Sequence, residues 1–219
     1  MTLFRLDTSF RTEGSVSRQV ADTLQKAWAD THPDATVVHR DLGTQPLPAD
    51  VWAASATAGF TPPEARTQAQ QDATALAATL ADELLAADAV VIGAPLYNFN
   101  LAQQLKIWID LVITDPRFGA GVTAPLAGKP VTLIVARGGG YGAGTPREGW
   151  DHATPYLLRI LGDVWGADVS LVAAELTLAE VNPAMAELRG VAAESLAQAH
   201  ELAAATGREL AQRALATAA

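Results

Sequence analysis

The chain has 219 residues, of which 49% are hydrophobic, and its formal net charge is −9. These values predict one globular domain over residues 1–219 and argue against a disordered chain or a nucleic-acid partner. No apolar run approaches the ~18 residues of a membrane span and the N-terminus lacks a signal-peptide pattern, so we expect a cytoplasmic protein with no membrane partner. The chain has no cysteine, and its four histidines lack ligand spacing, so we expect no metal site.

Short apolar runs, typical of buried strands, alternate with amphipathic helical patterns along the whole chain. Pro95 should end the third strand, because proline lacks the N–H that a central ladder needs. Arg5 is awkward in a buried first strand and has no explanation at this level. The strands expected are Thr2–Leu6, Ala35–His39, Ala89–Ala94, Val131–Ala136 and Val169–Ala174.

The helices between these strands have recognisable starts. Thr61 is expected to cap one helix, with Pro62 at its first position and Glu64 completing a capping box. Asn182 and Pro183 should start the last helix, which can break near Gly207. The helices expected cover residues 15–30, 51–58, 61–87, 101–113, 154–165 and 182 to the C-terminal part of the chain.

The alternation of strands and helices predicts an α/β fold, a parallel sheet with helices on both faces. Five strands fit the order 2-1-3-4-5 of a flavodoxin-like three-layer sandwich. In that order the loops 7–17, 95–100 and 137–146 follow the first, third and fourth strands. These loops therefore meet at one rim, at the carboxyl ends of neighbouring strands, where ligands bind in such folds.

The first loop carries hydroxyl groups close to a helix start. Ser9, Arg11, Ser15 and Ser17 offer hydroxyls, a cation and free helix amides, which suit a phosphate group. An ordinary helix cap within a solvated loop would explain the same residues.

The second loop combines aromatic and amide side chains. Tyr97, Asn98 and Phe99 offer apolar walls and amide donors to a flat heteroaromatic ligand. The alternative is a pair of aromatic rings that simply covers the end of the core.

The third loop, Arg137–Pro146, is rich in glycine and permits close backbone approach to a ligand. It contains a degenerate GxGxxA pattern, but no helix follows at once and no acidic residue ends a strand about twenty residues on. We therefore expect no nicotinamide fingerprint here. A flexible surface loop is the alternative interpretation.

The chain resembles the FMN-dependent NADH:quinone oxidoreductases, also called FMN-dependent NADH-azoreductases. The resemblance rests on Ser9 with Gly14–Arg18, Pro95–Asn100 followed by Leu105–Asp110, Arg137–Gly139, Thr154–Leu157 and Leu161-Gly162. It implies a flavodoxin-like homodimer with one tightly bound FMN per subunit near the interface. The donor would be NADH or NADPH, and quinones and aromatic azo compounds would be acceptors in ping-pong turnover.

The resemblance also implies roles for individual residues. Ser9 and Ser15–Ser17 would hold the phosphate, and Leu96–Phe99 and Ala136–Gly139 would line the isoalloxazine ring. The residues expected to bind FMN are Ser9, Arg11, Ser15, Val16, Ser17, Pro95, Leu96, Tyr97, Asn98, Phe99, Ala136, Arg137, Gly138 and Gly139.

The sequence departs from the family pattern at four positions. Phe10, Leu96 and Ala136 stand where Pro, Met and Ser are usual, and Tyr141 stands where some relatives have His. No residue is assigned as catalytic, but Tyr141 and Phe118 are candidates for the acceptor pocket. Segment 114–128, with Trp150 and Trp165, is expected to offer an apolar surface for dimerisation.

Three other functions remain open from the sequence. A flavodoxin-like electron carrier would show a dominant acidic docking face, whereas the acids here are spread along the helices. A tailoring flavin reductase would act on a pathway-specific substrate. A phosphate-binding hydrolase of similar fold lacks an evident nucleophile. The absorption spectrum of the purified protein separates the hydrolase from the flavoproteins.

Overall fold

Six strands and six helices make up the fold in a computed structural model that describes residues 1–218 and the side chains of residues 1–214. The strands are β1 (Thr2–Asp7), β2 (Thr36–Asp41), β3 (Ala89–Tyr97), β4 (Asn100–Leu101), β5 (Pro130–Ala136) and β6 (Asp168–Ala174). The helices are α1 (Val16–Thr31), α2 (Val51–Ala58), α3 (Gln68–Ala86), α4 (Gln103–Val112), α5 (Thr154–Leu158) and α6 (Arg189–Ala218). Short 3₁₀ segments lie at Pro63–Ala65 and Pro183–Leu188, and a π-helical segment, Arg159–Val164, continues α5.

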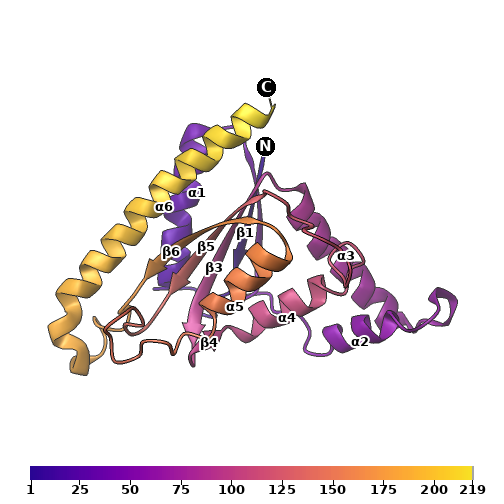
Figure 1. Ribbon diagram of the computed structural model, residues 1–219, viewed down its shortest axis with the longest axis horizontal. Coiled ribbons are helices and arrows are strands. Elements are labelled where there is room, and N and C mark those ends of the chain that lie inside the picture. Colours follow the sequence, from indigo (N-terminus) through magenta and orange to yellow (C-terminus); the bar gives the residue numbers. More distant parts are fainter. Residues whose placement is uncertain (219) are drawn as a thin grey trace.

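The five long strands form one parallel sheet in the order β2-β1-β3-β5-β6. This confirms the expected 2-1-3-4-5 order, with β5 and β6 as the fourth and fifth strands of the prediction. All five strands run downward in Figure 1, so their carboxyl ends share the lower edge of the sheet. The chain adds β2 on one side of β1, and β5 and β6 on the far side of β3, so the strand order reverses between β1 and β3, which is the switch point of this fold.

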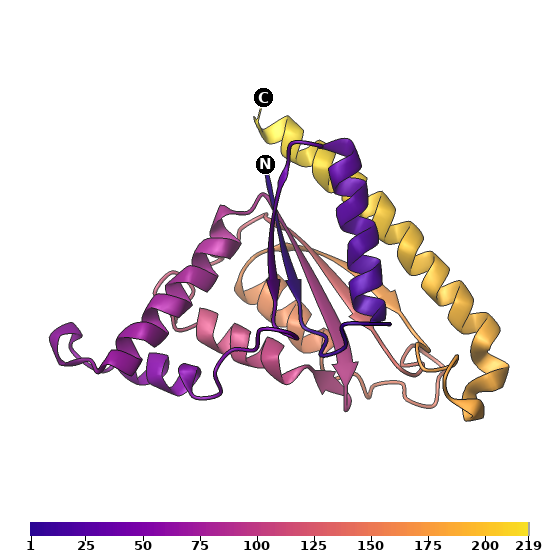
Figure 2. The same ribbon diagram turned by 180° about the vertical axis from the view of Figure 1, so that it is seen from behind.

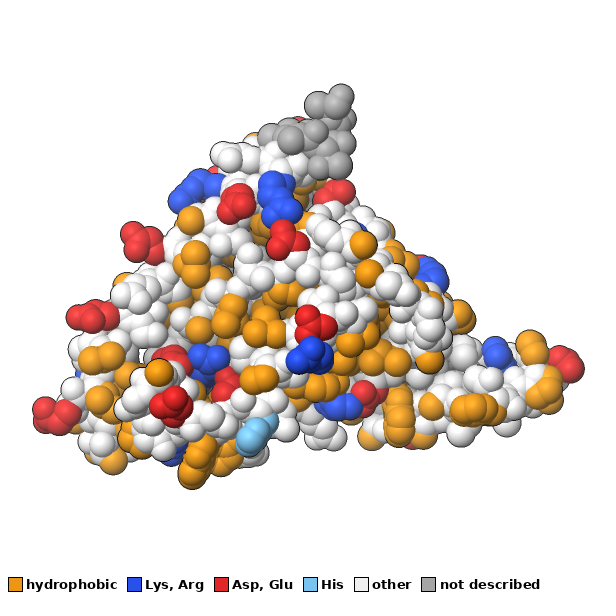
Figure 3. All heavy atoms as spheres, viewed as in Figure 1, with side chains coloured by type: hydrophobic (Ala, Val, Ile, Leu, Met, Phe, Trp, Pro, Cys, Tyr) orange, Lys and Arg blue, Asp and Glu red, His pale blue; other side chains and the backbone are white. Residues whose placement is uncertain are grey.

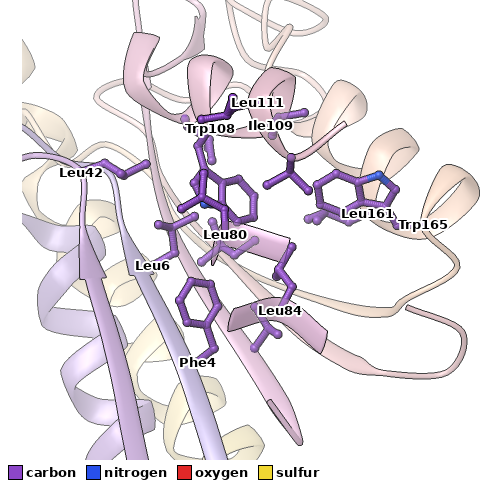
Figure 4. Packing of buried hydrophobic residues seen from close by; sticks show 14 of the residues in the cluster. Phe4, Leu6, Leu42, Leu80, Leu84, Trp108, Ile109, Leu111, Leu161 and Trp165 are labelled. Atoms are coloured by element: carbon purple, nitrogen blue, oxygen red, sulfur yellow. The ribbon is translucent and has the colours of Figure 1, made fainter. Parts of the chain in front are cut away.

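Helices cover both faces of the sheet, as Figures 1 and 2 show. Successive strand side chains point to opposite faces, so Ala89 and Val91 pack under α1 and α6, while Val90 and Ile92 pack under α3 and α4. The hydrophobic core under α3 and α4 is larger than the one under α1 and α6. Figure 4 shows its centre, where Phe4 and Leu6 of β1 meet Trp108 of α4.

Strand β3 continues through Pro95 to Tyr97, so the expectation that Pro95 ends it is wrong. The ladder between β3 and β1 stops at the Asp7–Gly93 pair, whereas the ladder with β5 reaches the Pro95–Ala136 pair. Pro95 therefore lies where β3 has a parallel partner on one side only, and its missing N–H costs no ladder bond. Beyond it, Tyr97 pairs with Asn100 of β4 in an antiparallel hairpin that the sequence analysis did not foresee.

The helix expected to begin at Thr61 begins six residues later. Thr67 caps α3 through a reciprocal box, in which its Oγ1 accepts from Gln70 N and its N–H donates to Gln70 Oε1. The reason is the second proline of the pair. Pro62 precedes Pro63, which disfavours helical backbone at Pro62, and its ψ of 141° is indeed extended.

Helix α6 runs without a break through Gly207, contrary to expectation. A Cβ at this position would lie 2.4 Å from the carbonyl oxygen of Leu24 in α1. The glycine therefore serves the close crossing of the two helices that share one face of the sheet. Among residues 1–218, no helix has both the length and the apolar character needed to cross a bilayer.

Candidate functional site

A cavity of about 250 Å³ lies at the carboxyl edge of the sheet, beside the switch point. It is walled by the loop after β1, the ends of β3 and β5, and the segment after β6. Its lining residues are Ser9, Phe10, Arg11, Gly14, Ser15, Val16, Ser17, Pro95, Leu96, Tyr97, Ala136, Gly138, Thr177 and Leu178.

One end of the cavity is the N-terminus of α1 with three buried hydroxyls. Ser9, Ser15 and Ser17 are 1%, 5% and 1% exposed, yet all three line the cavity. Ser15 occupies the N-cap position without capping the helix through its side chain. The first amides of a helix have no intrahelical partner, and the helix dipole is positive there. This end of the cavity therefore offers amide and hydroxyl donors to an anion, with the exposed Arg11 at its margin.

Arg18 holds the backbone of this loop from behind. Its Nη2 donates to the carbonyl of Ser9 at 2.7 Å and its Nε to the carbonyl of Arg11 at 2.9 Å. The same guanidinium makes a two-point contact with Asp41, Nη1 to Oδ2 at 2.8 Å and Nη2 to Oδ1 at 2.6 Å. Because Arg18 spans Asp41 and both carbonyls, the end of β2 fixes the shape of the loop after β1.

The ionised state of Asp41 is strongly favoured in this arrangement. Burial alone would raise the pKa of the carboxyl, but the hydrogen bonds from Arg18, Thr44 and the Gly43 amide outweigh it and lower the pKa to about 2. Asp41 in turn raises the pKa of Arg18. The pair is therefore charged over the whole physiological pH range.

A second buried carboxylate, Asp7, explains the arginine in β1. Arg5 contacts Asp7 Oδ2 at 2.8 Å and also reaches Asp22 at 2.6 Å, so its charge is compensated inside the sheet. His39 Nε2 lies 2.9 Å from the same Asp7 oxygen. Arg5, Asp7, Arg18, Asp22, His39 and Asp41 together form a continuous group, called here the ionic support, behind the loop after β1.

The other end of the cavity is mostly apolar. Tyr97 and Phe10 lie with ring centroids 5.0 Å apart at a tilt of 43°, and the Tyr97 hydroxyl is 3.0 Å from Ser9 Oγ. This hydrogen bond joins the polar and apolar ends. Phe10 is 69% exposed, and it also borders a second, wider hollow of about 700 Å³ that contains Asn98 and Gln103. A flat ligand in the first cavity would thus have an open neighbouring space.

The Tyr97–Asn100 turn has an unusual backbone. Asn98 and Phe99, its two central residues, have φ angles of 48° and 67°. Positive φ at both positions defines the tight hairpin turn whose twist matches the two strands, and Asn-Gly is its preferred sequence. Phenylalanine in this conformation is strained by about 1–2 kcal/mol. The Phe99 ring contacts Trp150 and Tyr141, and its carbonyl accepts from His152 N, which together hold the turn.

The glycine-rich loop contributes backbone to the cavity. A Cβ on Gly138 would lie 2.7 Å from Leu178 Cδ1, so a larger residue here would have to displace the end of the Leu178 side chain. Backbone hydrogen bonds from Thr177 N to the Arg137 carbonyl and from Leu178 N to the Gly138 carbonyl hold the segment after β6 against this loop.

Ten of the fourteen residues expected to bind a cofactor line the first cavity, and the other four lie around it. Asn98 lies at the second hollow, while Phe99, in the hairpin turn, and Gly139, in the glycine loop, line neither hollow. The Arg137 side chain turns away and pairs with Asp151 and Glu175.

Some of the residues expected at the acceptor pocket and the dimer surface lie near the site or at the surface, whereas others are buried in the core. Tyr141 lies near the cavity beside Phe99, with ring centroids 6.4 Å apart. Phe118 is 4% exposed and packs in the core on Trp165, which is fully buried. The expectation that Phe118 and Trp165 form exposed apolar surface is therefore wrong, because both fill space under α4 and α5. Trp150, at 52% exposed, is a surface residue as expected.

The sequence analysis missed four lining residues: Phe10, Gly14, Thr177 and Leu178. Phe10 was noted only as a departure from a family pattern. Thr177 and Leu178 carry no distinctive chemistry, but they follow a strand whose carboxyl end lies on the same rim. That position in the expected topology was the available signal.

The geometry fits a ligand with a phosphate at one end and a flat ring at the other. Hydroxyl and amide donors lie at one end and apolar side chains with exposed backbone at the other, within one cavity. FMN has this shape and charge distribution. Among the described residues, no group of three or more histidine or acidic side chains is arranged as a metal site.

Comparisons with known proteins give a consistent result. The model of a family described as flavodoxin-like fold matches residues 1–204. A protein of Streptomyces avermitilis named FMN-dependent NADH:quinone oxidoreductase is 45% identical over 97% of this chain and 98% of its own length. A Frankia alni protein of the same name is 43% identical over 86% of this chain and 90% of its own.

Solved structures agree with the fold. The azoreductase AzrA is 26% identical, with a TM-score of 0.76 over 95% of this chain and 100% of its own. An FMN-dependent NADH-azoreductase from Bacillus anthracis, solved in complex with FMN, is 20% identical, with a TM-score of 0.75 over 96% of this chain and 100% of its own. At that identity the second likeness supports the fold alone.

Proposed function

The chain belongs to the flavodoxin-like family that includes the FMN-dependent NADH:quinone oxidoreductases, and we propose on this basis that it is an FMN-dependent NAD(P)H:quinone oxidoreductase. Quinones are its acceptors, and aromatic azo compounds are a further class. The observation that carries the proposal is the single cavity that joins three hydroxyls at the start of α1 to an apolar slot between Tyr97 and Gly138. NAD(P)H is a cytoplasmic reductant, and we place the protein in that compartment.

Bound FMN supplies the redox centre that accepts a hydride and passes it on. Ser9, Ser15 and Ser17, with the first amides of α1, hold the phosphate. Tyr97 and Leu96 support the flat ring on one side of the slot, and Gly138 lets the ring lie close to the backbone. No protein nucleophile is required.

The residues around the ring tune its electronics and supply protons. Asn98 and the amides of the Asn98-Phe99 turn and of Gly138-Gly139 are assigned to the ring edge where negative charge develops on reduction, since donors there favour the reduced form. Water and the Tyr141 hydroxyl are the proposed proton donors. Asn98 is exposed at the open side, so the edge it faces is also the edge that meets solvent and substrate.

We propose a homodimer as the working assembly. Apolar side chains exposed on this subunit support it, among them Phe60 at 93%, Trp52 at 48% and Trp150 at 52% exposure. Phe60 lies in the arm between α2 and α3 that projects at the right of Figure 1, and Figure 3 shows hydrophobic side chains along that arm. Light scattering at micromolar concentration should give twice the chain mass, and a fully active monomer would refute this assembly.

The function is tested by cofactor binding and kinetics. The protein should purify with a flavin spectrum or bind FMN in calorimetry, and it should then oxidise NADH with a quinone. One site used in turn by donor and acceptor predicts parallel double-reciprocal lines. Absence of FMN binding at micromolar concentration would overturn the proposal. Flavin binding with negligible quinone-dependent NADH oxidation would instead indicate an electron carrier.

A further inference from the structure

Arg147 lies over an aromatic cluster beside the proposed flavin site. Its guanidinium carbon is 5.8 Å from the centroid of the Phe99 ring and 6.0 Å from that of Tyr141. Phe99 also contacts Trp150 edge to face, with centroids 5.5 Å apart. Stacking on two rings limits the orientations of a long, exposed side chain. The cation is therefore held in place at the surface.

The guanidinium of Arg147 has a hydrogen-bond partner but no ion-pair partner: its Nη1 donates to the Tyr141 hydroxyl at 3.5 Å. None of the ion pairs formed within residues 1–218 includes it. Two carboxylates of this region have other partners: Glu148 accepts from the Gly144 amide at 2.8 Å, and Glu175 binds Arg137 at 2.9 Å and accepts from Tyr141 N. Arg137, which lies ten positions before Arg147 in the chain, pairs by contrast with two carboxylates, those of Asp151 and Glu175. Arg147 thus presents an exposed cation that is not part of an ion pair among the described residues.

Arg147 lies between the two loops that bound the site. On one side, Phe99 follows Asn98, which lines the second hollow. On the other side, a Cβ on Gly139 would be 3.1 Å from Arg147 Nη1, and Gly138 lines the first cavity. In Figure 1 the loop between β5 and α5 runs along the lower edge next to β4, which brings the two sides together. Arg147 lines neither hollow, so an acceptor would contact its guanidinium only by extending past Gly139 and Phe99.

We propose that Arg147, stacked on Phe99 and Tyr141, is an anion subsite that selects acceptors carrying a carboxylate or sulfonate on their aromatic ring. The proposal rests on the proposed function and names the substrate class of that site. The planar guanidinium fork matches the spacing of such oxyanions, and the rings below it remove water from the contact. The formal net charge of the chain is −9, so an anionic acceptor needs a local cation to approach.

The same oxyanion chemistry has a second source, the phosphates of the donor. The acceptor is favoured because Arg147 lies on the open, aromatic side of the site. Phosphate recognition on the donor would show itself as a change in the KM ratio of NADPH to NADH. The experiment therefore measures both substrates separately.

The test uses the FMN-loaded protein and two quinones that differ in charge, 1,4-naphthoquinone-2-sulfonate and 2-methyl-1,4-naphthoquinone. For each, kcat/KM of Arg147→Met is divided by that of the unsubstituted protein, which cancels the different intrinsic reactivities. We expect the ratio to be about five- to tenfold lower for the sulfonate than for the neutral quinone, because one charge-assisted contact at an exposed site is lost. Arg147→Lys should recover part of it, since the charge remains but the fork is lost.

Arg208→Met is the matched control. It removes the same charge from an exposed position on α6, where Arg208 borders a shallow hollow with Lys26 and Asp30 away from the rim. Its two ratios should be equal. The discrimination by Arg147 should also shrink at 1 M salt, where the Debye length falls to about 3 Å.

Three results would overturn the inference: equal ratios for both quinones in Arg147→Met, an equal effect in Arg208→Met, or a change confined to the KM for NADPH. Each of these leaves flavin binding and turnover of the neutral quinone in place, so the proposed function survives. If neither quinone is reduced by the FMN-loaded, unsubstituted protein, the proposed function fails and the inference fails with it. As a second readout, redox-inert 2-naphthalenesulfonate should inhibit the unsubstituted protein competitively against the sulfonated quinone, and more weakly in Arg147→Met.

Discussion

The two ends of the cavity are built on opposite physical principles. The end at α1 is supported by buried, paired charges, with Arg18 and Asp41 only 12% and 18% exposed. The end at the Asn98-Phe99 turn is supported by exposed rings and a positive-φ backbone. A network of paired charges tolerates little change, whereas stacked surface rings can be exchanged at small cost. We infer that the first end fixes the cofactor and the second adapts to the acceptor.

The largest expected effect comes from removing the cation of the ionic support. Arg18→Met leaves the carbonyls of Ser9 and Arg11 without the Arg18 donor, and leaves Asp41 with only the Gly43 and Thr44 amides. The free energy of unfolding should fall by about 2–4 kcal/mol, slightly less than for a fully buried pair. Because the loop after β1 is displaced, FMN affinity should fall further than riboflavin affinity. Urea unfolding and calorimetry measure the two effects.

Lys26→Met is the control for that variant. It breaks the Lys26–Asp30 pair, whose side chains are 74% and 64% exposed. The change in unfolding free energy should stay within about 0.5 kcal/mol. Equal losses in Arg18→Met and Lys26→Met would show that the ionic support does not distinguish this end of the site.

The next effect separates holding the cofactor from tuning it. Ser17→Ala removes a hydrogen bond to the phosphate, worth about 1.5–3 kcal/mol, so FMN affinity should fall about ten- to a hundredfold. Turnover at saturating FMN should hardly change, because the phosphate takes no part in electron transfer. Asn98→Gly removes the side chain at the ring edge while keeping the positive φ, and should alter the reduction potential and the rate of reduction by NADH. Stopped-flow measurement of flavin reduction by NADH in both FMN-loaded variants tests this. Equal slowing of reduction in Ser17→Ala and Asn98→Gly would contradict the separation between holding and tuning the cofactor.

The two ends were also unequally predictable from sequence. The alternation of strands and helices, with the order of the strands, placed Ser9, Ser15 and Ser17 correctly at one rim. The ionic support was invisible, because Arg5 and Asp41 lie far apart in sequence and only the β1–β2 register brings their network together. The hairpin was missed because its turn carries Phe99 where glycine is usual. Tertiary contacts with Trp150 and Tyr141 override that local preference, and no local pattern encodes them.

Acid should weaken the α1 end. Asp41 has its pKa lowered from 3.8 to about 2 in the folded chain, so its contribution is complete above the unfolded value and is lost as the pH falls from about 5 towards 2. A shift of this size corresponds to about 2 kcal/mol. Asp41→Asn lacks this titration. The stability difference between the unsubstituted protein and Asp41→Asn should therefore narrow by about 1.5 kcal/mol between pH 6 and pH 2.5, since pH 2.5 is still above the folded pKa, and a constant difference would contradict the assignment.

The smallest effect tests the strained turn at the other end. Phe99→Gly and Phe99→Ala both remove the ring and its contacts with Trp150 and Tyr141, so the comparison between these two variants isolates the backbone. Alanine at a φ of 67° carries a strain of about 1–2 kcal/mol that glycine avoids. Glycine also raises the conformational entropy of the unfolded chain, which lowers the stability of Phe99→Gly by about 0.4–1 kcal/mol and offsets part of the relief of strain. Phe99→Gly should therefore be more stable than Phe99→Ala by about 0.5–1 kcal/mol in urea unfolding.

Ala75, an exposed position inside α3, is the control. There the order of glycine and alanine should reverse, because Ala75→Gly costs about 1 kcal/mol in a helix. If alanine is the more stable residue at both positions, the turn does not hold Phe99 in the left-handed conformation, and the rings of Phe99, Tyr141 and Trp150 do not support the acceptor end as described.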